Sequence, residues 1–166
     1  MDTIASDHSG SDATQAVANL GAVRPPLVYG TAIVTGLLLE SGWPLPFLPR
    51  LLTALLGSVL VVVGVVVFSY CIRTFQTAGT PVPGNKQTTI IVRTGPYRFS
   101  RNPIYLAFSM FQLGIASWAN SVWLIATLIA ALALMVSVVI PREERYLERR
   151  FGAEYVDYKR SVRRWL

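Results

Sequence analysis

The chain has 166 residues, of which 52% are hydrophobic and 14% are charged, against roughly 25% charged in a typical soluble domain. This composition excludes an ordinary soluble domain, and the single cysteine excludes an internal disulfide. Beside long apolar runs, the net charge of +6 indicates contact with anionic lipid rather than with nucleic acid.

The first segment, residues 1–23, differs in character from the rest of the chain. It is rich in serine and aspartate and contains no lysine or arginine. A polar segment with few large apolar residues cannot bury a core, so we predict a disordered N-terminal tail. Residues 24–166 are then expected to form a single membrane domain.

Two long apolar runs follow the tail. No residue is charged between Arg50 and Arg73, or between Arg101 and Arg142. An uncharged apolar run of about eighteen or more residues is typical of a transmembrane helix, and the second run is long enough for two. Its small and polar cluster "SWANS", residues 117–121, marks the break. We therefore predict four spans, at about 25–39, 51–72, 103–117 and 122–140.

The basic residues assign the sides of the membrane. Residues 73–101 and the tail after Pro141 are rich in lysine and arginine, whereas "SWANS" carries no charge. By the positive-inside rule the loop and both termini face the cytosol. We therefore predict an all-α integral membrane protein, in the cell inner membrane or an endomembrane, with a cytosolic loop and a C-terminal amphipathic helix.

The polar turn, defined here as "TGPYRFSRNPIY" at residues 94–105, directly precedes the third predicted span. Asn102 can cap that helix, and Pro103 suits its first position. Arg98 and Arg101 lie three residues apart among tyrosines, so they could clamp an anion and stack on a ring. The same residues could instead only anchor a helix at the membrane boundary, and the turn by itself leaves both interpretations open.

The tail at residues 141–164 has the spacing of an amphipathic helix that Gly152 can interrupt. Glu143 shares its apolar face with Leu147, Phe151, Tyr155, Tyr158 and Val162. An unpaired carboxylate there is costly, so a cationic partner is expected, either an arginine of the polar turn or a bound ammonium or sulfonium. Alternatively, the basic helix simply lies on the membrane surface.

Metal binding and histidine catalysis are not expected. The single histidine, His8, falls in the predicted tail, and Cys71 is the single cysteine. Any chemistry must therefore use Arg, Glu, Tyr and Asn side chains, or need little proton transfer.

In this order, the motifs resemble the membrane methyltransferases related to isoprenylcysteine carboxyl methyltransferase and the phospholipid methyltransferases. The resemblance covers about residues 75–165. It rests on three ordered blocks: Gly-Pro-Tyr-Arg, Arg-x-Pro-x-Tyr, and Glu-Glu-x-x-Leu followed by Phe-Gly-x-x-Tyr-x-x-Tyr. It implies an S-adenosylmethionine site, with S-adenosylhomocysteine as product, on the cytosolic side of a helical bundle.

The resemblance also implies roles for particular residues. The cofactor-binding set would be Tyr97, Arg101, Asn102, Pro103, Tyr105, Glu143, Glu144, Tyr155 and Tyr158. The catalytic set would be Arg98, Arg101 and Glu143. In one departure, the isoprenylcysteine enzymes typically read Arg-His-Pro where this chain has asparagine in the middle, so a titratable base at that position is absent.

We therefore predict an enzyme that methylates a lipophilic small molecule or prenylated acceptor, with membrane lipids as its partners. The reacting head group could be a carboxylate, a thiol or an amine, and the oligomeric state stays open. Two alternatives belong to other classes: a small four-span transporter or channel subunit, and a lipid-binding scaffold without catalysis. Such exporters keep an acidic residue in mid-membrane, whereas Glu40 lies at a predicted helix end.

Overall fold

The computed structural model describes residues 24–82 and 89–166, and within those ranges all the regular secondary structure is helical, with no strand. The predicted disordered tail, residues 1–23, lies outside the described residues. The elements are α2 (Pro25–Gly42), α3 (Arg50–Thr77), a 3₁₀ turn η1 (Gly95–Arg98), α4 (Pro103–Ala119), α5 (Val122–Leu134), a π-turn η2 (Met135–Val139), α6 (Ile140–Phe151) and α7 (Ala153–Ser161).

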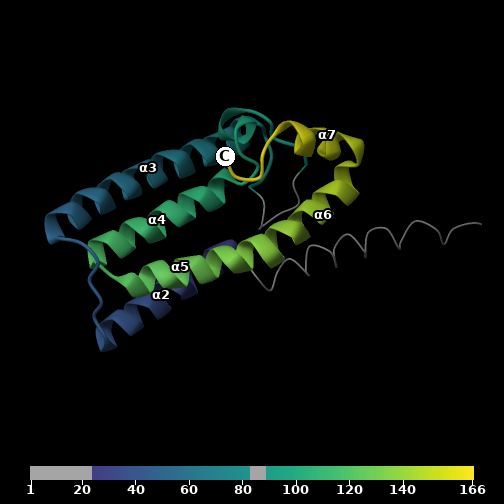
Figure 1. Ribbon diagram of the computed structural model, residues 1–166. Coiled ribbons are helices and arrows are strands. Elements are labelled where there is room, and N and C mark those ends of the chain that lie inside the picture. Colours follow the sequence, from purple (N-terminus) through teal and green to yellow (C-terminus); the bar gives the residue numbers. More distant parts are fainter. Residues whose placement is uncertain (1–23, 83–88) are drawn as a thin grey trace, which may run out of the picture.

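The long helices form a row in the order α3, α4, α5, α2 (Figure 1). Helix α4 packs between α3 and α5, and α2 packs against α5. Helices α2 and α3 follow each other in sequence but lie at opposite ends of the row. The proline-rich linker between them therefore crosses one end of the bundle. At the other end, beside the polar turn, residues of α2, α3 and α4 line a cavity.

Each predicted span coincides with a helix, but the helices end later than predicted, most of all α3 and the last one. Helix α3 continues past residue 72 to Thr77, since Phe75 is buried and extends the apolar contact into the polar region. Helix α5 runs through η2 into α6 without a break, so Val122 to Phe151 is one continuous helix. The π-turn ends at Val139, two residues before Pro141, where a regular helix would lose a hydrogen bond.

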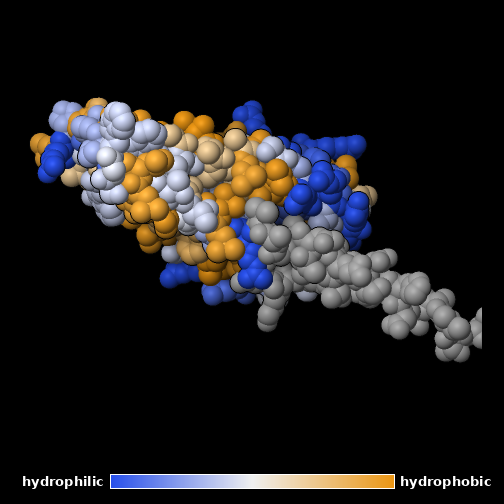
Figure 2. All heavy atoms as spheres, turned by 90° about the horizontal axis from the view of Figure 1, so that it is seen from below, coloured by the Kyte–Doolittle hydropathy of each residue, from blue (hydrophilic) through white to orange (hydrophobic). Residues whose placement is uncertain are grey.

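Two of the described helices, α3 and the continuous helix from Val122 to Phe151, are long and apolar enough to cross a membrane. Many large apolar side chains on α2 and α3 are exposed, among them Leu38, Leu51, Val62 and Val66. Figure 2 shows hydrophobic side chains over the middle of the molecule and hydrophilic ones gathered at the end where α6 and α7 lie. This distribution fits an apolar surrounding for the helix bodies.

The predicted tail helix, 141–164, is shorter than expected, and its interruption lies where the sequence allows one. It breaks at Gly152, whose φ of 55° and ψ of −129° lie outside the helical range, and α7 ends at Ser161. Val162 is extended, because the residues after it bond to the polar turn instead of continuing the helix. The tail thus consists of two short helices followed by an extended end.

Asn120 fastens the linker between α2 and α3 to the far end of the bundle. It takes a left-handed conformation (φ 51°) between α4 and α5. Its side-chain oxygen accepts hydrogen bonds from the backbone N–H groups of Phe47 (3.1 Å) and Leu48 (3.2 Å), and its amide donates to the Leu48 carbonyl (2.8 Å). The break that "SWANS" predicts is therefore also a tertiary contact.

Candidate functional site

The polar turn is held against α3 and α7 through Tyr97. This buried side chain packs edge-on against Phe75, with ring centroids 5.1 Å apart at 81°, and its carbonyl accepts a hydrogen bond from the Tyr158 hydroxyl (2.7 Å). Gly95 opens the turn with φ 58°, and a Cβ there would lie 2.7 Å from the Thr74 hydroxyl oxygen. The Gly-Pro-Tyr-Arg sequence therefore suits a tight turn that must fit closely against a helix.

The two arginines of the polar turn take different positions. Arg98 is exposed, with its guanidinium carbon 5.5 Å from the ring centroid of Phe99. Arg101 points inward, its side chain is 10% exposed, and Nη1 donates to Glu144 Oε1 at 2.9 Å. The structure thus brings Arg101 together with the predicted acidic pair but leaves Arg98 outside it.

Glu144 is the centre of a buried ion-pair cluster. Its side chain is 8% exposed and it accepts from Arg101 and, in a two-pronged contact, from Arg164: Nε to Oε1 at 3.1 Å and Nη2 to Oε2 at 2.7 Å. Lys159 lies 3.9 Å away. Burial of a carboxylate is tolerated when cations and hydrogen bonds saturate it, and this one is saturated by the protein itself.

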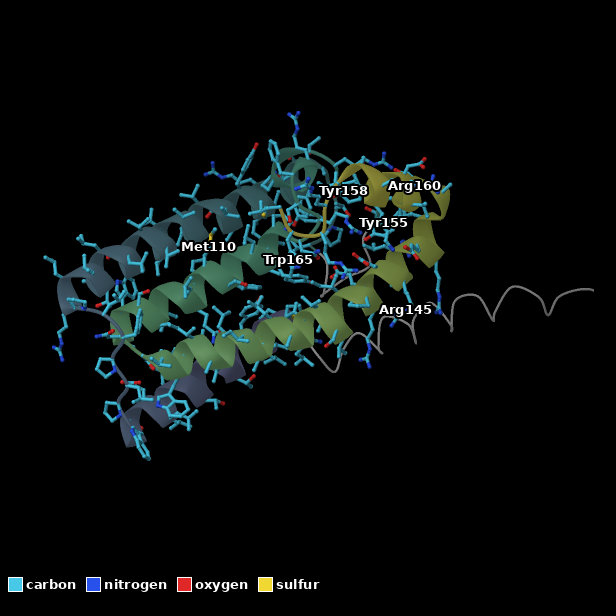
Figure 3. The ribbon with its side chains drawn as sticks, viewed as in Figure 1. Met110, Arg145, Tyr155, Tyr158, Arg160 and Trp165 are labelled. Atoms are coloured by element: carbon cyan, nitrogen blue, oxygen red, sulfur yellow. The ribbon has the colours of Figure 1, made fainter. Side chains whose placement is uncertain are left out.

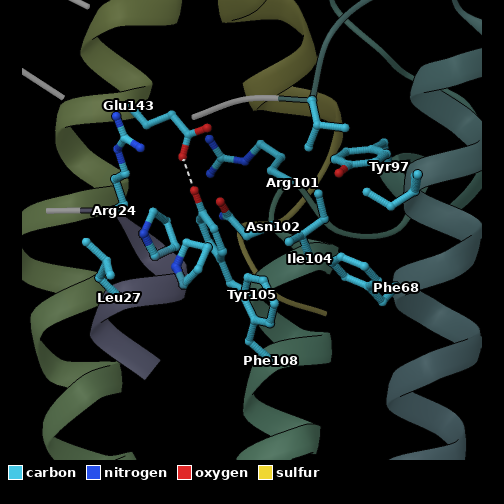
Figure 4. A pocket seen from close by; sticks show the side chains of 14 residues that line it. Arg24, Leu27, Phe68, Tyr97, Arg101, Asn102, Ile104, Tyr105, Phe108 and Glu143 are labelled. Carbon is cyan, nitrogen blue, oxygen red and sulfur yellow. Dashed lines mark hydrogen bonds between the residues drawn. The ribbon is translucent and has the colours of Figure 1, made fainter. Parts of the chain in front are cut away.

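Glu143 points elsewhere, although it is the next residue. Its carboxylate accepts a hydrogen bond from the Tyr105 hydroxyl at 2.6 Å, drawn as a dashed line in Figure 4. Within residues 24–82 and 89–166, no lysine or arginine nitrogen comes within ion-pair distance of it. The sequence predicts either an arginine of the polar turn or a bound cation as the partner of Glu143. In the described part of the chain, no arginine forms an ion pair with it.

Asn102 and Pro103 also lie in this region. Pro103 is the first residue of α4, as predicted, and is buried. Asn102 occupies the cap position, but its side chain makes no capping bond. Its amide instead donates to the Arg164 carbonyl at 3.0 Å, because the C-terminal residues come within reach of the turn. The expected side-chain cap is therefore wrong.

Tyr155 and Tyr158 face the polar turn from α7 (Figure 3), with ring centroids 6.1 Å apart. Both are nearly fully buried, whereas Arg145 and Arg160 are exposed. Burial raises the pKa of the Tyr155 hydroxyl to about 12, and it also raises the pKa values of Tyr97 and Tyr158. All three tyrosines are therefore neutral hydrogen-bonding groups at physiological pH.

Two cavities meet at this cluster. The interhelical cavity, of about 540 Å³, is lined by Arg24, Pro25, Pro26, Leu27, Phe68, Ile72, Val82, Tyr97, Arg101, Asn102, Ile104, Tyr105, Phe108 and Glu143. The tail cavity, of about 60 Å³, is lined by Phe75, Ile90, Ile91, Val92, Tyr97, Arg101, Glu143, Leu147, Tyr155 and Tyr158. Because Tyr97, Arg101 and Glu143 line both, they form a wall between the two.

Figure 4 shows the Arg101 side chain and the Glu143 carboxylate pointing toward each other among the side chains that line the interhelical cavity. Opposite charges, a phenol ring and a mostly apolar lining thus meet within one hollow. A volume of about 540 Å³ falls in the range of roughly 300–1,000 Å³ that small-molecule sites occupy.

A far-end cavity of about 760 Å³ is larger, and its lining includes Glu40, Arg50 and Trp118. It lies beside the linker that Asn120 holds and contains none of the predicted site residues. Size alone would favour it, but the convergence of buried charges and aromatic rings places the candidate site at the polar turn.

Arg164 and Arg24 are candidate site residues that the sequence analysis did not select. Arg164 stands among several basic residues near the C-terminus, so its pattern gave no reason to choose it from its neighbours. Arg24 lines the interhelical cavity and directly precedes the two prolines of α2. Its position at a predicted helix start is the sequence feature that could have selected it.

Comparison with known proteins identifies the family. A model of the family described as phospholipid methyltransferase matches residues 52–154, which is more than half of the chain and includes the polar turn, α6 and the start of α7. The chain belongs to the phospholipid methyltransferase family. This confirms the resemblance stated from the sequence motifs.

Individual relatives agree with this membership. The chain is 30% identical over 113 residues to a yeast (Saccharomyces cerevisiae) protein-S-isoprenylcysteine O-methyltransferase, covering 67% of this chain and 47% of that protein. It is 37% identical over 77 residues to a nickel-cobalt-cadmium resistance protein, NccN, of Alcaligenes xylosoxydans xylosoxydans, covering 46% and 36% of the two. The chain thus spans less than half the length of these curated relatives. No solved structure matches it.

Proposed function

We propose that the protein is an S-adenosylmethionine-dependent methyltransferase of the membrane, acting on a lipophilic acceptor. The observation that carries this proposal is the wall of Tyr97, Arg101 and Glu143, which separates a mostly apolar cavity between helices from a smaller one under the tail. Family membership and the activity named for the yeast relative support the reaction class.

The proposed topology has four membrane-spanning helices: α2, α3, α4 and α5 with its continuation. Helix α4 has 17 residues, or about 26 Å at roughly 1.5 Å per residue, which is close to the thickness of a hydrocarbon core. The basic residues of the polar turn and of α6 and α7 support a cytosolic position for that end. Both termini would then be cytosolic.

The residues at the wall fit the methyl donor. Arg101 Nε is buried without a hydrogen-bond partner, and a guanidinium edge of this kind suits the donor's carboxylate. Glu143 would hold the ammonium or sulfonium, and the ring of Tyr97 or Tyr155 would contact the sulfonium or the base. When bound, the donor supplies an activated methyl group on its sulfonium. Glu144 positions Arg101 rather than touching the ligand.

The acceptor would enter the interhelical cavity from the bilayer between α2 and α3. Leu27, Phe68, Ile104 and Phe108 provide apolar contact for its tail, and its head would face the wall. A carboxylate or thiolate acceptor needs no base, because it is already ionised. An amine would first have to lose a proton, and among the residues that line this cavity Glu143 carries the one carboxylate. Holding the reactants in line, away from water, would supply much of the acceleration.

The test is titration calorimetry of the detergent-solubilised protein with S-adenosylhomocysteine, followed by transfer of radiolabelled methyl groups to membrane lipid extracts. We expect saturable binding and labelled product in the lipid phase. Folded protein that binds no cofactor at concentrations on the order of 1 mM would contradict the proposal and favour a transporter subunit or a scaffold.

A further inference from the structure

The last residues of the chain, 162–166, run back over the polar turn and are called the C-terminal strap here. The backbone N–H of Arg101 donates to the Arg163 carbonyl at 3.0 Å. The Arg164 carbonyl accepts from the Asn102 amide at 3.0 Å and from the Ser100 hydroxyl at 3.3 Å. The strap lies outside the residues that the family model matches, which end at residue 154.

The side chain of Arg164 uses both oxygens of Glu144. Its Nε donates to Oε1 at 3.1 Å and its Nη2 to Oε2 at 2.7 Å. Arg101 therefore contacts Glu144 through Nη1 alone, which donates to Oε1 at 2.9 Å, and its Nε is buried with no hydrogen-bond partner. The hydrogen bonds to Glu144 also raise the pKa of the Arg164 guanidinium.

Arg101 and Arg164 share the carboxylate of Glu144, and the contact made by Arg164 limits the one that Arg101 can make. A guanidinium and a carboxylate prefer the two-pronged arrangement, and only one arginine can take it with a given edge of the carboxylate. Because Arg164 has taken it, Arg101 cannot turn its own fork onto Glu144. Arg101, with its unpartnered Nε, therefore stays in the wall between the two cavities.

We propose that Arg164 is a positioning residue: by saturating Glu144, it keeps the free edge of Arg101 available to the carboxylate of the methyl donor. The inference rests on the proposed function, because it assigns a ligand group to Arg101. Without Arg164, the Arg101 fork would rotate onto Glu144 and leave the ligand carboxylate unpaired. Lys159 cannot substitute, since its ammonium is held by Glu148 at 2.6 Å and lies 3.9 Å from Glu144.

The experiment compares two ligands that differ by one group: S-adenosylhomocysteine and its decarboxylated form. Calorimetry measures both against the wild type, Arg164→Ala and Arg163→Ala. Arg163 is the matched control, because its carbonyl, rather than its exposed side chain, contacts the turn. We expect Arg164→Ala to weaken S-adenosylhomocysteine about 10- to 100-fold, to leave the decarboxylated ligand unchanged, and Arg163→Ala to change neither.

A double-mutant cycle separates positioning from a general structural role. In an Arg101→Ala background, Arg164→Ala should weaken S-adenosylhomocysteine no further, because the residue acts through Arg101. Arg164→Lys keeps the charge but not the fork, so it should show the same selective loss at smaller size, and it replaces the alanine variant if that does not fold.

Equal weakening of both ligands, or a full additional loss in the Arg101→Ala background, would overturn the inference while leaving the proposed function intact. Wild-type affinity in the Arg164 variants would do the same. If the wild type itself binds neither ligand, the proposed function fails and this inference fails with it.

Discussion

Glu143 and Glu144 are adjacent in sequence but have opposite surroundings. Glu144 has three cationic neighbours, whereas Glu143 has the Tyr105 hydroxyl and faces both cavities. A cationic ligand group would therefore bind Glu143 rather than Glu144. Substitution of Glu143 should change ligand binding directly, whereas substitution of Glu144 would remove the partner of two arginines.

Glu143→Gln should weaken S-adenosylhomocysteine binding by roughly 10- to 100-fold, because the amide keeps the hydrogen bond to Tyr105 but loses the charge that a ligand ammonium needs. Calorimetry at constant pH measures the change. Glu154→Gln is the matched control, since Glu154 is exposed and pairs with Arg93 at the surface. Equal affinity in wild type and Glu143→Gln would remove Glu143 from the site.

Arg101 and Arg98 provide a second comparison within one turn. Arg101→Ala should lower the affinity for the cofactor by about tenfold or more, because it removes the buried guanidinium of the wall. Arg98→Ala should leave the affinity within about twofold of wild type, because that side chain stands outside both cavities. If the Arg98 variant lost binding while the Arg101 variant kept it, the geometry assigned to the turn would be incorrect.

At the scale of elements, the packing of α3 against α4 depends on small residues. Gly114 of α4 faces α3 so closely that a Cβ would lie 2.6 Å from a Val61 methyl group and 3.1 Å from the Gly57 carbonyl oxygen. Glycines at helix interfaces allow this close approach where helices meet in an apolar surrounding. Because the polar turn enters α4 directly, this contact also sets the position of the site.

Gly114→Val should destabilise the protein by about 1–3 kcal/mol, since the added side chain must push two helix backbones apart. Thermal unfolding in detergent measures the change. Gly30→Val in α2 is the control, because a Cβ there meets nothing within 4 Å. Similar unfolding temperatures for the two variants would contradict the close packing of α3 and α4.

At the scale of the whole molecule, most of the lysine and arginine residues that the structure describes lie at one end of the bundle. The polar turn, α6 and α7 lie together at one end, and the linker between α2 and α3 lies at the other (Figure 1). If four helices cross the bilayer, these ends face opposite sides of it.

Single cysteines test this topology. With Cys71 replaced by alanine, Pro46→Cys in the linker should react with a membrane-impermeant maleimide on intact cells. Arg160→Cys in α7 should react only after permeabilisation, because the basic end is predicted to be cytosolic. The reverse pattern, or labelling of both in intact cells, would contradict the four-span orientation.

The sequence by itself determined the helices and the family. The two long charge-free runs must be helical if they lie in lipid, so the three segments predicted within them correspond to α3, α4 and α5. "SWANS" predicted the turn between α4 and α5, and Pro103 predicted a helix start, because both are local backbone preferences. The ordered motifs also predicted the family, because a motif is recognised from the order of its residues without knowledge of their tertiary contacts.

Only the tertiary structure decided which polar side chains meet. Neighbouring residues on a helix project about 100° apart, and the apolar spacing placed Glu143 on one face, but no local pattern tells that Glu143 meets the Tyr105 hydroxyl while Glu144 is paired with arginines. The separation of Arg101 from Arg98, and the return of Arg164 over the turn, depend on contacts between segments distant in the chain. Burial and pairing are properties of the assembled bundle, and they choose among residues that the sequence leaves equivalent.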